Sequence, residues 1–86
     1  MHAVVVTVKV GNVEEARPEL LEQVVPAVSQ APGFVAGYWL EPVDGHGLSV
    51  VVFESEEAAK VAAERVQPPS SVTIETVEVR EVVASA

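Results

Sequence analysis

Valine occupies every second position from residue 4 to residue 10 of the chain. Positions 4, 6, 8 and 10 are all valine, whereas Ala3, Val5, Thr7 and Lys9 occupy the odd positions between them. A period of two is that of a β-strand, whose successive side chains point to opposite faces, and β-branched residues favour this conformation. The pattern predicts a first strand over residues 3–10 with one purely apolar face.

A helical period follows this strand. Asn12, with Glu15 three residues later, is typical of a capping box at a helix start. Pro18 and Pro26 interrupt the segment, so we expect a kinked helix over about residues 18–30, preceded by a separate turn or a kinked first turn at 13–17. The helix is expected to stop at Pro32-Gly33. The apolar positions at helical spacing are Leu20, Val24, Ala27, Val28 and Ala31.

Two alternating segments, residues 34–41 and 48–54, flank the sequence Asp44-Gly45-His46-Gly47. Alternation on both sides of an Asp-Gly turn predicts an antiparallel hairpin. The hairpin contains every aromatic residue of the chain: Phe34, Tyr38, Trp39 and Phe53.

The C-terminal third predicts one more helix and one more strand. Ser55 is expected to cap a short alanine-rich helix over residues 58–66, which Pro68-Pro69 should end. Residues 71–83 are typical of a strand, but the alternation slips in the middle of it, so we expect a bulge or bend near Thr76. This strand is longer than its expected partners, and its end is predicted to pair elsewhere, with a partner subunit.

The order β-α-β-β-α-β predicts an α+β fold of the ferredoxin-like type, with a four-stranded antiparallel sheet and both helices on one face. Residues 1–86 are expected to form a single domain. Two helices cover only one face of a sheet, yet the strands are apolar on both faces. We therefore expect the second face to be covered by another copy of the chain, in a homodimer.

Charge and composition exclude several classes of protein. The chain has 13 acidic and 5 basic residues and a net charge of −8, which disfavours binding to nucleic acids and to anionic membrane surfaces. It contains no cysteine, so disulfides and thiolate metal sites are excluded. Neither a signal-peptide pattern nor an apolar run of transmembrane length is evident, and we expect a soluble, cytoplasmic protein.

Four residues are predicted to line a cavity between the two subunits: Thr7, Trp39, Ser49 and Phe53. Trp39 either stacks on a planar ligand or fills the dimer core. The hydroxyls of Thr7 and Ser49 either bind a ligand or satisfy nearby backbone groups. Tyr38 is expected on the opposite face, under the helices.

The histidines offer little chemistry. His46 is interpreted as an exposed turn residue with no evident carboxylate partner except Asp44, and the spacing of His2 and His46 fits no metal motif. The sequence contains no phosphate-binding glycine loop, dinucleotide fingerprint or Ser-His-Asp grouping. We expect no metal and no cofactor, and the sequence identifies no catalytic residue.

The segments P-G-F, G-Y-W-L-E-P, D-G and V-V-V-F-E-S-E-E-A-A, at 32–34, 37–42, 44–45 and 50–59, resemble those of the dimeric α+β barrel proteins. Within these, the chain is most similar to the antibiotic-biosynthesis-monooxygenase-like (ABM-like) group, whose members are homodimers. Characterised members include cofactor-independent monooxygenases of aromatic polyketide-type substrates and haem-degrading enzymes. The haem-degrading pattern, an Asn on the first strand and a His on the second helix, is not matched here.

Two hypotheses follow from this resemblance. The first is a cofactor-independent monooxygenase acting on a small apolar or aromatic metabolite in the barrel cavity. The alternative is a non-catalytic homodimer that binds a small ligand or is purely structural. The nearly complete lack of acids and bases among the predicted cavity residues favours the alternative. The volume of the cavity discriminates between the two, because an interior closed by valine side chains leaves no room for a substrate.

Overall fold

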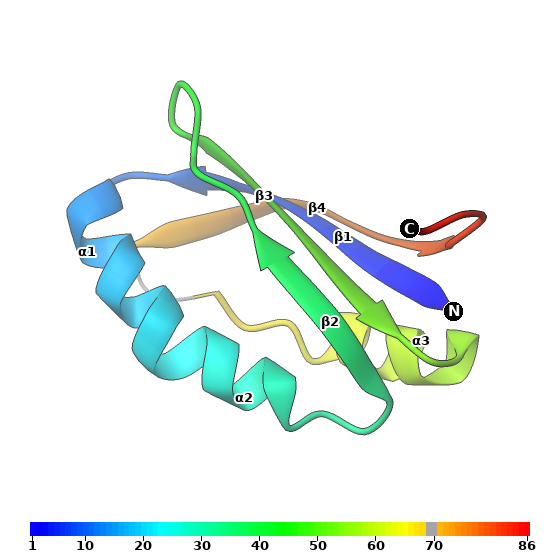
Figure 1. The fold of residues 1–86 in the computed structure, drawn as a ribbon. Helices are drawn as coiled ribbons and strands as arrows, with labels where there is room; N and C mark the ends of the chain where they lie inside the picture. Colours follow the sequence, from blue (N-terminus) through cyan, green and yellow to red (C-terminus); the bar gives the residue numbers. More distant parts are fainter. Residues whose placement is uncertain (69–70) are drawn as a thin grey trace.

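A computed structural model describes residues 1–68 and 71–86. It confirms the predicted α+β, ferredoxin-like fold, with a four-stranded antiparallel sheet and the helices on one side of it (Figure 1). Pro69, predicted to help end the second helix, lies outside the described residues. The elements in chain order are β1 (His2–Val10), α1 (Val13–Glu19), η1 (Leu20–Val24), α2 (Val25–Ser29), β2 (Phe34–Trp39), β3 (His46–Phe53), α3 (Glu56–Glu64) and β4 (Val72–Glu81).

The strands are arranged in the order β2-β3-β1-β4, and each neighbouring pair is antiparallel. The predicted irregularity near Thr76 is confirmed: Thr7 pairs with Thr76 and Val8 pairs with Ile74, so Glu75 is an extra residue on β4. The end of β4 does not leave its own sheet, because Val79, Arg80 and Glu81 pair with the first residues of β1. β4 is an edge strand of this sheet, and pairing of its end with a partner subunit stays a prediction.

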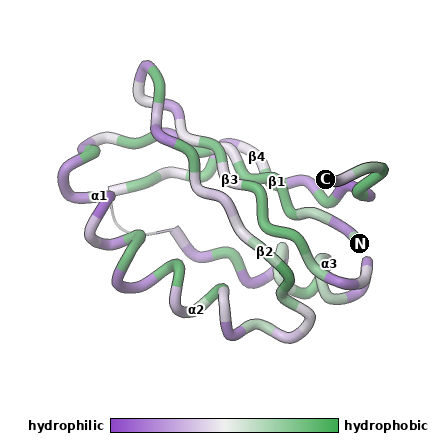
Figure 2. The backbone as a smooth tube through the Cα atoms, in the orientation of Figure 1, coloured by the Kyte–Doolittle hydropathy of each residue, from purple (hydrophilic) through white to green (hydrophobic). Residues whose placement is uncertain are grey.

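The core lies between the sheet and the helices. Phe53 is only 1% exposed and its ring meets that of Phe34 edge-on, with 6.3 Å between the centroids and 82° between the planes. Burying a side chain of this size contributes about 1.5–3 kcal/mol. Figure 2 shows the hydrophobic colour concentrated along β3, from which Val51 and Phe53 enter the core. Other buried members of the core are Val4, Val6 and Ala59.

The segments α1, η1 and α2 follow one another without a break and are called here the first helical segment. It begins at Val13, earlier than predicted, because the Asn12 side chain accepts hydrogen bonds from the N–H groups of Glu14 (3.0 Å) and Glu15 (3.2 Å). Its middle is π-helical, with the Val25 N–H donating to the Leu20 carbonyl. Pro26 follows directly, so the predicted kink has both a proline and a π turn as its cause.

The second helix, α3, begins and ends two residues earlier than predicted and packs closely on the sheet. The Ser55 hydroxyl accepts a hydrogen bond from the Ala58 N–H at 3.1 Å, which confirms the predicted cap. Ala59 is completely buried against the core, and small side chains on this face let the helix approach the strands. No helix in the part of the chain that the structure describes has the length and apolarity needed to cross a bilayer.

The other face of the sheet carries no helix and is called here the open face. Its apolar part comes from β2, β3 and β1, and its polar part from β4. Tyr38 belongs to this face, where it pairs with Val50 and is 61% exposed. The prediction that Tyr38 lies under the helices was wrong. The open-face residues on regular pairing positions are Ala3, Val5, Thr7, Lys9, Ala36, Tyr38, His46, Leu48, Val50, Val52, Thr73, Thr76, Glu78 and Arg80.

Candidate functional site

A cleft of about 1340 Å³ opens between the first helical segment and the helix-facing side of the sheet. We call it the helix–sheet cleft. Its floor is formed by strand residues, its outer wall by the first helical segment and one end by α3. The apolar side chains that define it are Val4, Val6, Val8, Trp39, Val51 and Ile74 on the floor, Leu20, Val24 and Val28 on the outer wall, and Ala58 and Ala62 on α3.

The cleft exists because the first helical segment does not pack down on the sheet. None of α1, η1 or α2 contains a buried residue. Only the end of the segment reaches the core, through Val28 and Ala31. Apolar residues earlier in the segment, such as Leu20 and Val24, therefore line the cleft without filling it. An apolar, largely pre-formed concavity of this kind is typical of small-molecule sites.

Trp39, at the end of β2, is the large aromatic side chain of the cleft. It is partly buried and contacts the core cluster on one side. Its six-membered ring lies over Gly37 and fills the space beside this glycine. The remaining surface of the indole faces the cleft.

Ser49 lies directly beside Trp39, because the two residues are paired across β2 and β3. Among the described strand residues of the cleft, Ser49 has the only hydroxyl group. This hydroxyl makes no hydrogen bond to another residue of the described chain, and neither does the Trp39 indole N–H. Two residues whose polar groups have free hydrogen-bonding capacity are thus paired on an apolar floor, and such groups can orient a ligand.

The four predicted cavity residues do not share one face. Trp39, Ser49 and Phe53 lie on the helix-facing side, whereas Thr7 lies on the open face and bonds the hydroxyl of Thr76. The grouping of Thr7 with the others was wrong, since Thr7 pairs with Leu48 and it is Val6 that pairs with Ser49. Phe53 is 1% exposed, so its ring belongs to the packed core beneath the cleft.

Charged groups lie at the edges of the cleft and not on its floor. Arg17 of α1 and Glu41, which follows β2, form an ion pair of 3.0 Å, and both line the cleft. The other ionisable residues of the lining are Glu54, Glu57 and Arg65. The floor as described offers no acid or base, so a reaction there would depend on ionisation of the substrate itself.

The sequence analysis missed a histidine–carboxylate pair outside the cleft. The extra residue of β4, Glu75, places its carboxylate 2.8 Å from Nδ1 of His46. Bulges commonly re-aim a side chain in this way. The slip in alternation at Thr76 was a signal for the bulge, but it could not identify His46 as the partner. Both side chains are exposed, at 58% and 39%, and neither is part of the cleft lining.

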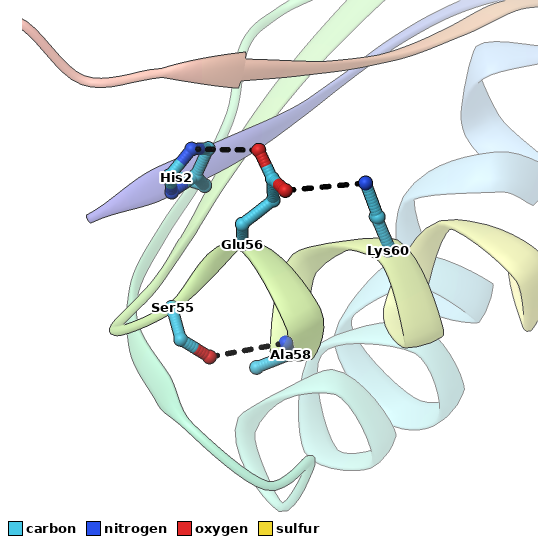
Figure 3. A network of polar contacts seen from close by, with 5 residues as sticks. All are labelled: His2, Ser55, Glu56, Ala58 and Lys60. Carbon is cyan, nitrogen blue, oxygen red and sulfur yellow. Dashed lines mark hydrogen bonds and ion pairs between the residues drawn. The ribbon is translucent and has the colours of Figure 1, made fainter.

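A second polar network joins β1 to the start of α3 (Figure 3). His2 Nε2 lies 3.4 Å from one oxygen of Glu56, and Lys60 Nζ lies 3.2 Å from the other. The hydrogen bond from Lys60, its charge and that of His2 lower the pKa of Glu56. The Nδ1 atom of His2 is buried without a hydrogen-bond partner. The network ties the N-terminal strand to α3 and lies outside the cleft.

Metal-ligand candidates are not clustered. In residues 1–68 and 71–86, no group of three or more histidine or acidic side chains is placed to hold a metal ion. No protein-family model, curated protein or solved structure matches the chain.

Proposed function

We propose that this protein binds a small, apolar, partly aromatic molecule in the helix–sheet cleft, and that it acts on this ligand as an ABM-like, cofactor-independent monooxygenase. One observation carries the proposal: the floor of an apolar cleft of about 1340 Å³ holds an indole and, on the adjacent strand, a hydroxyl that has no hydrogen-bond partner among the described residues. The volume exceeds the 300–1,000 Å³ of typical ligand pockets. A ring system of two or three fused rings fits this space.

The chemistry of the lining favours a neutral, largely apolar ligand. Trp39 offers an aromatic surface for stacking, and Ser49 offers a hydrogen bond to a carbonyl or phenolic oxygen. The net charge of −8 disfavours polyanionic ligands. The site proposed here is within one chain, between helices and sheet, and not in the cavity between two subunits that the sequence analysis expected.

The resemblance to the ABM-like group supplies the reaction. A phenolic substrate with an activated CH₂ group ionises and transfers electrons directly to O₂. One oxygen atom then replaces the two hydrogens as a carbonyl, and the other leaves with them as water. The chain's own part is to hold the ring on Trp39, to orient its oxygen at Ser49 and to keep the reacting carbon in an apolar environment.

The second candidate is a non-catalytic ligand-binding protein, the alternative of the sequence analysis. The observation that favours it is the lack of an acid or base on the described floor of the cleft. Both candidates place the ligand in the same site, so one experiment separates them. In both cases we propose a cytoplasmic homodimer that associates through the open face, because the apolar half of that face has no cover within the chain.

The experiment uses Trp39, which is the chain's only tryptophan. Its fluorescence is followed while anthrone or 1-naphthol is added, and oxygen uptake is recorded with anthrone. Ser49→Leu should abolish saturable quenching by filling the floor, whereas Thr73→Leu, on the open face at the β4 edge, should leave it unchanged. Quenching with oxygen uptake supports the monooxygenase, and quenching without uptake supports the non-catalytic alternative. Absence of saturable quenching in the wild type would contradict both.

A further inference from the structure

The α1 part of the first helical segment, about two turns long, is attached to the rest of the molecule by polar side chains. In α1, Arg17 binds Glu41 at 3.0 Å and Glu19 accepts a hydrogen bond from the Ser71 hydroxyl at 3.2 Å. No residue of α1 is buried. Elements with few buried apolar contacts open locally at low free-energy cost, so these two contacts have a large share in holding α1 in place.

The element that connects α1 to α2 is η1, an irregular helix. In η1 the hydrogen bond runs from the Val25 N–H to the Leu20 carbonyl, five residues back. Pro26, directly after it, has no N–H to restore the α-helical register. Beyond this point Val28 packs against the core. The segment thus has a fixed end at α2 and a π-helical turn at which the α1 end can pivot.

The Arg17–Glu41 ion pair spans the edge of the helix–sheet cleft. Arg17 comes from the outer wall and Glu41 from the chain that follows the floor strand β2, and both side chains line the cleft. A contact between wall and floor at the edge of a cavity restricts the approach of a molecule to the interior. Trp39, two residues before Glu41, lies inside this boundary.

We propose that α1 and η1 form a hinged lid over the cleft and that the Arg17–Glu41 pair is its latch. The pair sets how often the cleft opens, and so how fast an apolar ligand enters and leaves. This regulation rests on the proposed function, because it concerns the same cleft. The latch is exposed, with side chains 60% and 76% accessible. Exposed ion pairs contribute about 0.2–1 kcal/mol, so its loss should increase the open population about 1.4- to 5-fold.

The lid is tested first without any ligand, through quenching of Trp39 fluorescence by acrylamide. Glu41→Gln should raise the quenching rate constant by about the same factor as it raises the population of the open state. The charge-swapped variant Arg17→Glu/Glu41→Arg should restore it, because the pair is re-formed with opposite polarity. Lys60→Gln is the matched control: it breaks an ion pair of similar exposure on α3, whose residues Glu56 and Lys60 do not line the cleft. The latch is overturned if the wild type and Glu41→Gln have equal quenching rate constants. It is also overturned if the charge-swapped variant does not return to the wild-type quenching rate constant.

A second measurement links the lid to the ligand. In stopped-flow experiments with 1-naphthol, Glu41→Gln should raise the association and dissociation rate constants together, each about 1.4- to 5-fold, with little change in Kd. An unchanged association rate constant overturns the lid even if acrylamide quenching rises. If 1-naphthol does not bind the wild type, the proposed function fails, while the acrylamide measurement still decides whether the lid exists.

Discussion

The six-membered ring of Trp39 lies against the backbone of Gly37, two residues earlier on the same face of β2. A Cβ atom built on Gly37 would stand 2.8 Å from Cη2 and 2.9 Å from Cζ3 of the indole. The nearest other atom is Cε2 of Phe34, at 3.5 Å. The glycine is therefore required for the position of the indole, and the indole forms part of the floor of the cleft.

Gly37→Ala should displace the Trp39 ring, because carbon atoms do not approach to 2.8 Å. Forced repacking of this kind costs about 1–3 kcal/mol. We expect a changed tryptophan emission maximum, weaker binding of 1-naphthol and a lower urea midpoint. Gly11→Ala is the control, since its nearest neighbour, the Ser71 carbonyl oxygen, is 3.7 Å away. An emission spectrum of Gly37→Ala identical to that of the wild type would show that the ring is not where we describe it.

Removal of a helix cap should have different effects at the two helices. Ser55→Ala should lower the free energy of unfolding by about 1 kcal/mol, because α3 buries Ala59 in the core and cannot fray without loss of packing. Ser55→Asp retains an acceptor and should restore most of the loss. Asn12→Ala should mainly increase amide exchange in α1, which buries no residue. The measurements are urea unfolding and hydrogen exchange. A larger urea effect at Asn12 than at Ser55 contradicts this account.

The order and type of the elements were predictable because each segment carries its own periodicity. The period of two in residues 3–10 predicted β1, and the slip in alternation near Thr76 predicted the bulge in β4. The assignment of faces was not predictable, because valine occupies both sides of the central strands: Val4 and Val5 on β1, and Val50 and Val51 on β3. Period two divides residues into two sets but does not say which set meets the helices. For this reason Tyr38 was expected on the wrong face.

The candidate site was predictable only in part, for a related reason. Trp39 and Ser49 were grouped correctly because both belong to one hairpin. Thr7 was grouped wrongly because its face depends on the register between β1 and β3, which no local turn fixes. The cleft itself arises from a helix that stands away from the sheet, and helical periodicity cannot measure that distance. The His46–Glu75 pair joins residues 29 positions apart in the chain and has no local signal.

Glu56 gives a prediction about pH. Its pKa is lowered mainly by the hydrogen bond and charge of Lys60, and further by His2 (Figure 3). A carboxylate whose pKa is lower in the folded state stabilises the fold above its unfolded pKa, and this contribution is lost as the pH falls through the folded pKa. Lys60→Gln should therefore raise the pKa of Glu56 toward its ordinary value, as measured by carbon NMR of the carboxyl group.

The same substitution should lower stability at neutral pH, and the difference from the wild type should shrink as the pH falls below the pKa of Glu56. Lys60→Arg keeps the charge and should behave like the wild type. The Glu56 side chain is exposed, so the effect on unfolding is expected to be small, and the NMR titration is the decisive measurement. A Glu56 pKa that is unchanged in Lys60→Gln would contradict the assignment of Lys60 as its main cause.

The proposed homodimer is tested at the centre of the open face. Val50 lies there between Tyr38 on β2 and Val5 on β1. A lysine at this position would place an unpaired charge inside an apolar interface, at a cost of several kcal/mol, but within a single chain it would remain in water. Val50→Lys should therefore halve the mass measured by light scattering while the circular dichroism spectrum stays unchanged. Thr73→Lys, on the polar β4 side, is the matched control and should remain dimeric.

Truncation of the chain after Thr76 is not a suitable test of the dimer, because Val77, Val79 and Glu81 pair with β1 of the same chain. Loss of these residues would damage the fold whether or not a partner exists. The point substitution avoids this ambiguity, since it changes one side chain that points away from the core. A wild-type monomer at high concentration, or a dimer that persists in Val50→Lys, would mean that the open face is not the interface. The helix–sheet cleft would then be the part of the proposal that remains, because it is formed within one chain.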